Sequence, residues 1–86
     1  MKIVDGFVLK NIADTNVVVP VGNNVSFRAI ISLNGSGAFL WNLLTKDTDE
    51  ETLVKALTAE YVVDEETARN DVKEFIDIMR RANLIV

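Results

Sequence analysis

The stretch VSFRAIISLNGSGAFLWNLL, residues 25–44, decides the fold because its hydrophobic period changes halfway along. Apolar and polar residues alternate over residues 25–33, which predicts a strand. Asn34-Gly35-Ser36-Gly37 then predicts a turn, and the crowded apolar residues after it predict a buried helix. One strand face, which we expect to lie against the core, carries Val25, Phe27, Ala29, Ile31 and Leu33, and the other face carries Ser26, Arg28, Ile30 and Ser32.

Two further strands are expected before this stretch. Residues 3–13 are rich in β-branched residues, a turn is predicted at residues 14–16, and residues 17–21 predict the second strand. Pro20 cannot donate a ladder hydrogen bond, so it belongs at an edge or a strand end. The connections are short, so we expect an antiparallel meander, since parallel strands need long crossovers.

Two more helices are expected after it. Thr48 followed by Glu51 is a capping box that predicts the start of the second helix. Asp64 and the acidic residues after it predict a third helix that runs to about Ala82, with Asn83 as its stop and an apolar tail packed back on the domain. We therefore expect an α+β, winged-helix-like fold, with a three-stranded antiparallel sheet followed by three helices in a single domain, residues 1–86.

The composition excludes several kinds of chemistry. The 86 residues include no cysteine and no histidine, which removes thiolate metal sites, a cysteine nucleophile and the usual general base. The net charge of −4 argues against a nucleic-acid binder. The chain shows neither a membrane span nor a signal peptide. We expect a cytoplasmic protein that is not an enzyme and needs no metal or cofactor.

Three features near the turn are better explained by structure than by function. Asn34-Gly35-Ser36-Gly37 lacks the ending and the glycine spacing of a phosphate-binding loop, so we expect a turn and a helix N-cap. The acidic residues 47–51 lack the spacing and glycine of a calcium loop, and helix capping explains them. Trp41 stands in so apolar a stretch that we expect it in the core.

The third helix and the third strand suggest a peptide-binding surface. At helical spacing, Val72 falls on the apolar stripe of the helix, and Asp71 and Ile78 fall on one flank. The other flank carries Arg69, Lys73, Ile76 and Arg80, which form either an ordinary solvated face or a basic rim around an apolar anchor. A basic rim of this kind suits an acidic, hydrophobic peptide. In a regular meander, residues 25–32 are an edge strand without Pro or Lys, which suggests strand addition by an extended peptide.

The sequence resembles the PqqD-like family of peptide-recognition domains over nearly its whole length. The resemblance rests on residues 33–44, Thr48-Asp49-Glu50-Glu51, the leucine at 57 with Glu60-Tyr61, Asp71-Val72 with Phe75-Ile76, and Leu84-Ile85. Asn83 departs from the family, in which glycine is common at that place.

This resemblance implies a function as well as a winged-helix-like fold. Such domains bind the leader segment of a precursor peptide by strand addition to the third strand, against the third helix, and present the peptide to a modifying enzyme, often a radical SAM protein. The expected peptide-binding residues are Val25, Ser26, Phe27, Arg28, Ala29, Ile30, Ile31, Arg69, Val72, Lys73, Ile76 and Arg80.

Two alternatives stay open at this point. The first is a DNA-binding winged-helix regulator with the third helix in the major groove, which the basic residues of that helix permit and the net charge opposes. The second is a structural subunit that docks on an enzyme through its exposed edge. The same edge could also pair two copies of the chain into a homodimer.

Overall fold

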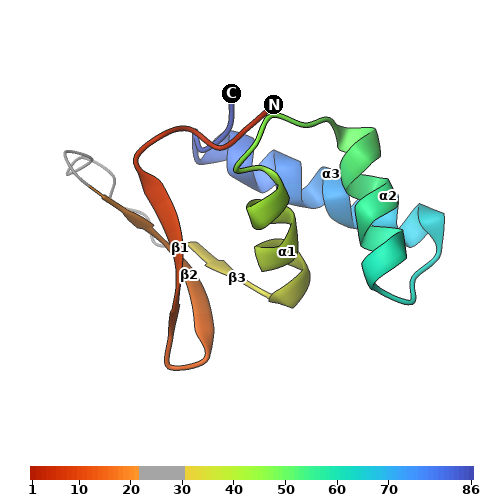
Figure 1. Cartoon of the computed structure of the whole chain (residues 1–86), viewed down its shortest axis with the longest axis horizontal. Helices are drawn as coiled ribbons and strands as arrows, with labels where there is room; N and C mark the ends of the chain where they lie inside the picture. Colours follow the sequence, from red (N-terminus) through yellow and green to blue (C-terminus); the bar gives the residue numbers. More distant parts are fainter. Residues whose placement is uncertain (22–30) are drawn as a thin grey trace.

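A three-stranded antiparallel sheet precedes the helices, as the sequence predicts. The computed structural model describes residues 1–21 and 31–86, in which the strands are β1 (Phe7–Ile12), β2 (Thr15–Pro20) and β3 (Ile31–Leu33). The strand order is β1-β2-β3, and both pairs are antiparallel (Figure 1). Ile31 and Leu33 are half-buried and pack against the core, while Ser32 is exposed, so the predicted alternation holds for this part of the third strand.

The β1–β2 turn lies earlier than the sequence predicts. Ile12 pairs with Thr15, so the turn consists of Ala13 and Asp14 rather than residues 14–16. Both residues have positive φ, at 52° and 65°, as the tight hairpin turn that matches strand twist requires. Asn16 belongs to the strand, and its side-chain oxygen accepts a hydrogen bond of 3.2 Å from Asn11. The prediction failed because alanine seldom adopts positive φ.

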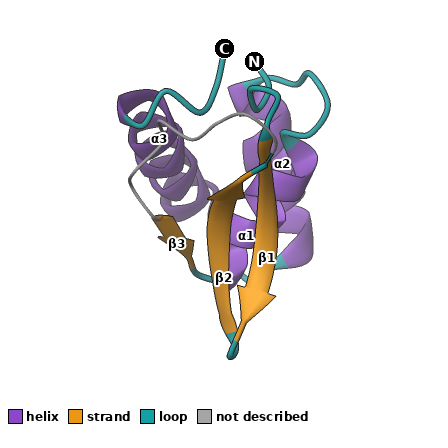
Figure 2. Cartoon of the chain, turned by 90° about the vertical axis from the view of Figure 1, so that its left-hand side faces the viewer, coloured by secondary structure: helices purple, strands orange, loops and turns teal. Residues whose placement is uncertain are grey.

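The helices are α1 (Gly35–Leu43), α2 (Glu50–Glu60) and α3 (Glu65–Arg81). They lie on one side of the sheet, with α1 between the strands and α2 (Figure 1 and Figure 2). Asp64 caps α3 as predicted, but the N-cap of α2 is Asp49 and not Thr48. The backbone of Thr48 is engaged elsewhere, because its N–H donates to the carbonyl of Met1 and its carbonyl accepts from the chain's amino terminus. The α+β, winged-helix-like prediction is confirmed.

The core lies between the sheet and the helices. Trp41 is 2% exposed, which confirms the prediction that it packs inside and does not form a binding platform. The sheet contributes Val18, and the N-terminal segment contributes Ile3. The remaining buried hydrophobic residues come from the helices, from the residue after α1 and from the tail, namely Leu40, Leu44, Leu53, Val54, Leu57, Ala68, Val72, Phe75, Ile76, Met79 and Leu84.

The apolar tail packs back on the domain, as predicted. Asn83 ends α3 with φ of 60°, a left-handed conformation that asparagine tolerates. Leu84 is fully buried, and its carbonyl accepts a 2.8 Å hydrogen bond from the N–H of Val4. Ile3 and Ile85 form an isolated antiparallel bridge. The two ends of the chain are therefore joined beside α3.

The helix caps predict how stability depends on pH. Asp49 and Asp64 each accept a backbone N–H at 2.7 Å, and this bonding lowers the pKa of both carboxyls below the ordinary value of 3.8. A lowered folded-state pKa stabilises the fold above the unfolded pKa, and that stability is lost as the pH falls through the folded value. We expect a constant melting temperature down to about pH 5 and a decline below about pH 4, followed by circular dichroism.

The matched control replaces both caps by asparagine. Asp49→Asn with Asp64→Asn keeps a side-chain oxygen that can accept the same N–H but does not titrate. The double variant should therefore lose less stability than the unaltered chain between about pH 5 and pH 3. Parallel melting curves for the two proteins across this range would show that the caps do not cause the acid sensitivity.

Candidate peptide-binding groove

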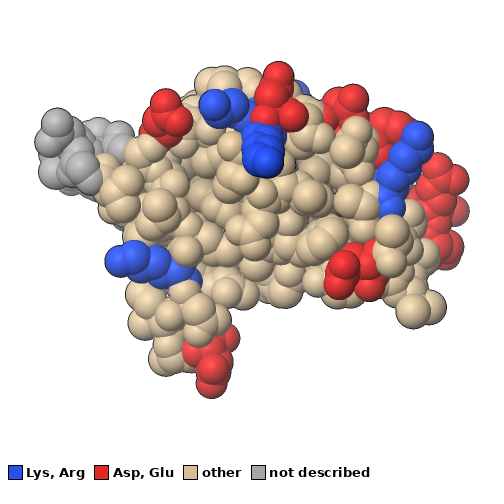
Figure 3. Space-filling model, in the orientation of Figure 1, with Lys and Arg blue, Asp and Glu red and all other residues tan. Residues whose placement is uncertain are grey.

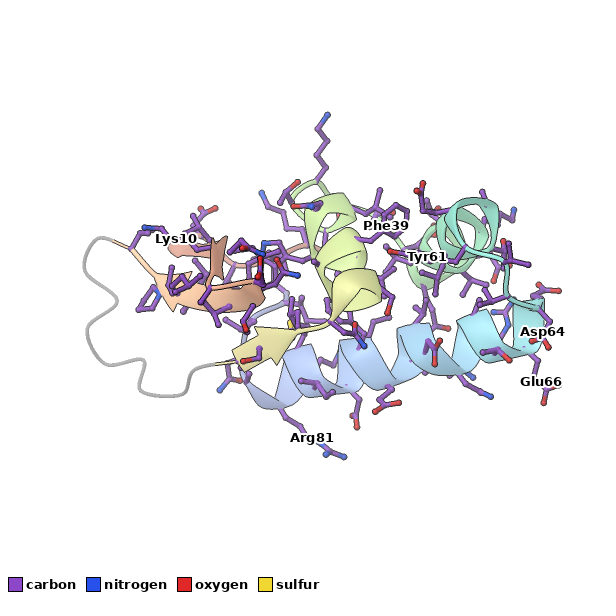
Figure 4. All side chains as sticks on the ribbon, turned by 90° about the horizontal axis from the view of Figure 1, so that it is seen from below. Lys10, Phe39, Tyr61, Asp64, Glu66 and Arg81 are labelled. Carbon is purple, nitrogen blue, oxygen red and sulfur yellow. The ribbon has the colours of Figure 1, made fainter. Side chains whose placement is uncertain are left out.

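A groove with a volume of about 210 Å³ lies between β3 and α3. Figure 4 shows β3 beside α3, with the two elements running in opposite directions and α1 starting where β3 ends. The wall from the strand and the start of α1 includes Ser32, Leu33 and Asn34, and the wall from α3 includes Asp71, Glu74 and Ile78. The groove therefore follows the side of the sheet at which β3 is the last described strand.

The junction between β3 and α1 fixes one end of this groove. The side-chain oxygen of Asn34 accepts hydrogen bonds from the N–H of Gly37 at 2.8 Å and the hydroxyl of Ser36 at 3.0 Å. Gly37 is buried, and a Cβ added there would lie 3.3 Å from the Cβ of Leu33 and 3.2 Å from the Asn34 oxygen. Glycine thus allows α1 to begin directly against the end of the strand.

One flank of α3 faces β3 and combines acidic and apolar side chains. Asp71, Glu74 and Ile78 are exposed, and Ile78 leaves 41% of its surface open. Phe75 is only 6% exposed and lies in the wall between them. Neither carboxylate forms an ion pair with any residue in the described part of the chain. The groove can therefore receive an apolar side chain and a positive charge.

A second hollow, of about 330 Å³, continues the groove beyond the end of β3. Asn34, Ser36 and Asp71 line both spaces, so the two are contiguous. Tyr61, which follows α2, forms part of the far wall, and its ring meets that of Phe39 edge to face at 5.7 Å (labelled in Figure 4). Asp71 therefore marks the end of the groove nearest α1, and Ile78 marks the opposite end.

The structure describes six of the twelve predicted site residues. Val25, Ser26, Phe27, Arg28, Ala29 and Ile30 lie outside the described residues. Ile31 lies in β3, half-buried, at the edge of the sheet. Of the predicted helix residues, Val72 and Ile76 are 0% and 4% exposed, so both belong to the core. The prediction of Ile76 as an exposed apolar anchor is wrong, because α2 packs against that side of α3.

The three basic residues predicted to bind the peptide do not line the groove beside β3. Arg69 donates to both carboxylate oxygens of Glu51 in α2, at 2.9 and 3.2 Å, and to Glu65 at 3.0 Å. These bonds raise the pKa of Arg69 and lower that of Glu51. Lys73 and Arg80 line a neighbouring hollow of about 500 Å³ with Ile76 and with Glu50 of α2. Glu74 lines both this hollow and the groove, so the two spaces adjoin, but neither Lys73 nor Arg80 lines the groove itself.

The sequence places Asp71 and Ile78 on one flank of α3, but it does not indicate that this flank faces the peptide. The signal available in the sequence for this flank is an isoleucine, Ile78, that stands beside acidic residues on an otherwise polar side of α3. A helical period separates the two flanks of α3, but it does not say which neighbouring element covers each one.

Acidic side chains gather over the end of the molecule formed by α2 and the start of α3 (Figure 3). Within residues 1–21 and 31–86, no group of three or more acidic, histidine or cysteine side chains is placed to hold a metal ion. Over the same residues, no helix is both long and apolar enough to cross a membrane.

Comparison with known proteins adds two similarities. The family model described as Coenzyme PQQ synthesis protein D (PqqD) matches residues 16–85. A solved structure, TbiB1 in complex with the TbiA(beta) leader peptide, shares 30% sequence identity with this chain and a TM-score of 0.75. The match covers 98% of this chain and 93% of that one. Among curated proteins, none matches the sequence.

Proposed function

The chain belongs to the PqqD family, and we propose that it binds the leader segment of a precursor peptide and presents the peptide to a modifying enzyme. The observation that carries this proposal is the similarity to TbiB1, a protein solved with a leader peptide, together with an open groove beside β3. In our proposal the chain itself performs no catalysis, and the modifying enzyme is a radical SAM protein.

We propose that the leader adds as a strand to β3. The β1–β2 and β2–β3 pairs are antiparallel, and antiparallel pairing is the slightly more stable kind, so an antiparallel leader strand extends the sheet most favourably. The other edge, β1, is a poorer template. It carries the exposed Lys10, a residue that blunts strand edges, and it does not line the groove.

The edge of β3 has two competing uses. A second copy of the chain could pair through β3 and form a homodimer, and a docking surface on the modifying enzyme could use the same backbone groups. Both would compete with the leader. Size-exclusion chromatography should therefore show that leader binding leaves a monomer–leader complex and reduces any dimer.

The test is a titration of the isotope-labelled chain with the leader encoded beside its gene, followed by NMR. We expect shifts concentrated at residues 31–36 and 71–78, with a dissociation constant of about 1 μM. Leaders methylated at single backbone nitrogens should lose affinity at alternate positions, because a strand directs its N–H groups to the partner at every second residue. Shifts confined to other regions would contradict the groove, and a scan without alternation would contradict strand addition.

A DNA-binding function has no support from the geometry. Arg69 is paired with Glu51 and Glu65, and Arg81 is paired with Asp77 at 2.8 Å. The other two basic residues of α3, Lys73 and Arg80, line a hollow together with three carboxylates. A helix that enters the major groove needs cations free for phosphates and base edges. We expect no retardation of duplex DNA in a low-salt gel-shift assay.

A further inference from the structure

We infer that the groove between β3 and α3 selects a leader segment in which a basic residue stands two positions before an apolar residue. This inference rests on the proposed function and deepens it, because it names the chemistry of the peptide rather than a new site. It also reverses the charge preference expected from the sequence, which placed the basic flank of α3 against the peptide.

The wall of the groove formed by α3 carries negative charges that would complement a basic residue of the peptide. Asp71 and Glu74 are exposed in the groove and lack an ion-pair partner among the described residues. Arg69 is bound to α2, and Lys73 and Arg80 lie on the far side of Glu74, in the neighbouring hollow and not in the groove. A carboxylate on the peptide would meet the like charges of Asp71 and Glu74, whereas a lysine or arginine would pair with them. The aliphatic stem of either basic residue can also lie along the apolar floor near Phe75.

The spacing of Glu74 and Ile78 along α3 matches the spacing of alternate residues along a strand. Glu74 and Ile78 are four residues apart on α3, which corresponds to about 6 Å along the helix axis. Two residues of an extended strand span about 6.7 Å, and side chains two apart point to the same face. A strand in the groove therefore places one side chain near Glu74 and Asp71 and the next one on that face over Ile78.

The direction of the peptide along α3 decides the order of its basic and apolar residues. β3 and α3 run in opposite directions (Figures 1 and 4), and Asp71 lies near the end of β3. A peptide antiparallel to β3 therefore runs in the same direction as α3. It passes the two carboxylates first and Ile78 afterwards, so the basic residue comes before the apolar one.

The experiment compares four capped peptides with one Ser/Thr framework, which contain Lys-Thr-Leu, Glu-Thr-Leu, Leu-Thr-Lys or Lys-Thr-Ser at the centre. Each is titrated into the labelled full chain and followed by NMR at residues 31–36 and 71–78. We expect the first peptide to bind about fivefold more tightly than each of the other three, which matches the modest strength of exposed ion pairs and of one apolar contact. Equal affinities, or no detectable binding of the first peptide, would overturn the inference.

Charge-reversal variants assign the effect to the groove. Asp71→Lys with Glu74→Lys should reverse the preference, so that the Glu-Thr-Leu peptide binds more tightly than the Lys-Thr-Leu peptide. The matched control, Asp5→Lys with Glu60→Lys, makes the same change in net charge outside the groove and should keep the original order. If the control reverses the order as well, overall charge and not the groove explains the selectivity. Natural leader binding with no charge selectivity would refute this inference and leave the proposed function intact.

Discussion

Ile78→Gln should weaken leader binding by about tenfold or more while leaving the fold intact. Ile78 keeps 41% of its surface open, on the flank of α3 that faces β3. A bound peptide would cover this apolar surface, and glutamine would replace it by an amide that loses its water without a partner. The melting temperature should hardly change, because the substitution lies on an exposed helix face and glutamine is a good helix former. Fluorescence polarisation of a labelled leader measures the loss.

The matched control is Ile12→Gln. Ile12 is also an exposed isoleucine, at 55%, but it lies at the end of β1, away from the groove. We expect its leader affinity to equal that of the unaltered chain. The groove would be the wrong site if Ile78→Gln bound normally, and a non-specific apolar contact would be indicated if both variants lost affinity equally.

The order of elements could be read from the sequence because each one carries its own local signal. The alternation over Ile31–Leu33, the helix N-cap at Asn34 and the acidic start at Asp64 all act within a few residues, and the structure confirms them, although α1 begins at Gly35 and so takes in most of the predicted turn. Where a local signal was missing, the prediction shifted. The β1–β2 turn depends on positive φ at Ala13, which the identity of that residue does not announce.

The candidate site could be predicted only in part, because it depends on how elements pack against one another. The helical period correctly put Asp71 and Ile78 on one flank of α3 and Arg69 on the other. Which flank meets β3 is decided by the position of α2, held to α3 by buried contacts and by the Arg69–Glu51 pair. Ile76 is buried for the same reason. No pattern within α3 alone contains that information.

Leu84→Ala should destabilise the fold by about 2 to 5 kcal/mol, the usual cost of removing a buried leucine. A domain of this length has a total stability of roughly 4 to 13 kcal/mol, so this loss is a large fraction of the whole. Leu84 is fully buried although it stands two residues from the end of the sequence. Urea denaturation followed by circular dichroism gives the free energy of unfolding for both proteins.

The control for this prediction is Val86→Ala, which shortens a residue of the same tail that is 76% exposed and should change stability by less than about 0.5 kcal/mol. Two similar denaturation curves would mean that the tail merely rests on the surface. The two variants should also differ in leader binding. The carbonyl of Leu84 accepts a hydrogen bond from the N–H of Val4, and this backbone contact is retained when the side chain is shortened to alanine. Leader binding by Leu84→Ala should therefore fall in proportion to the unfolded fraction, whereas Val86→Ala should bind the leader like the unaltered chain.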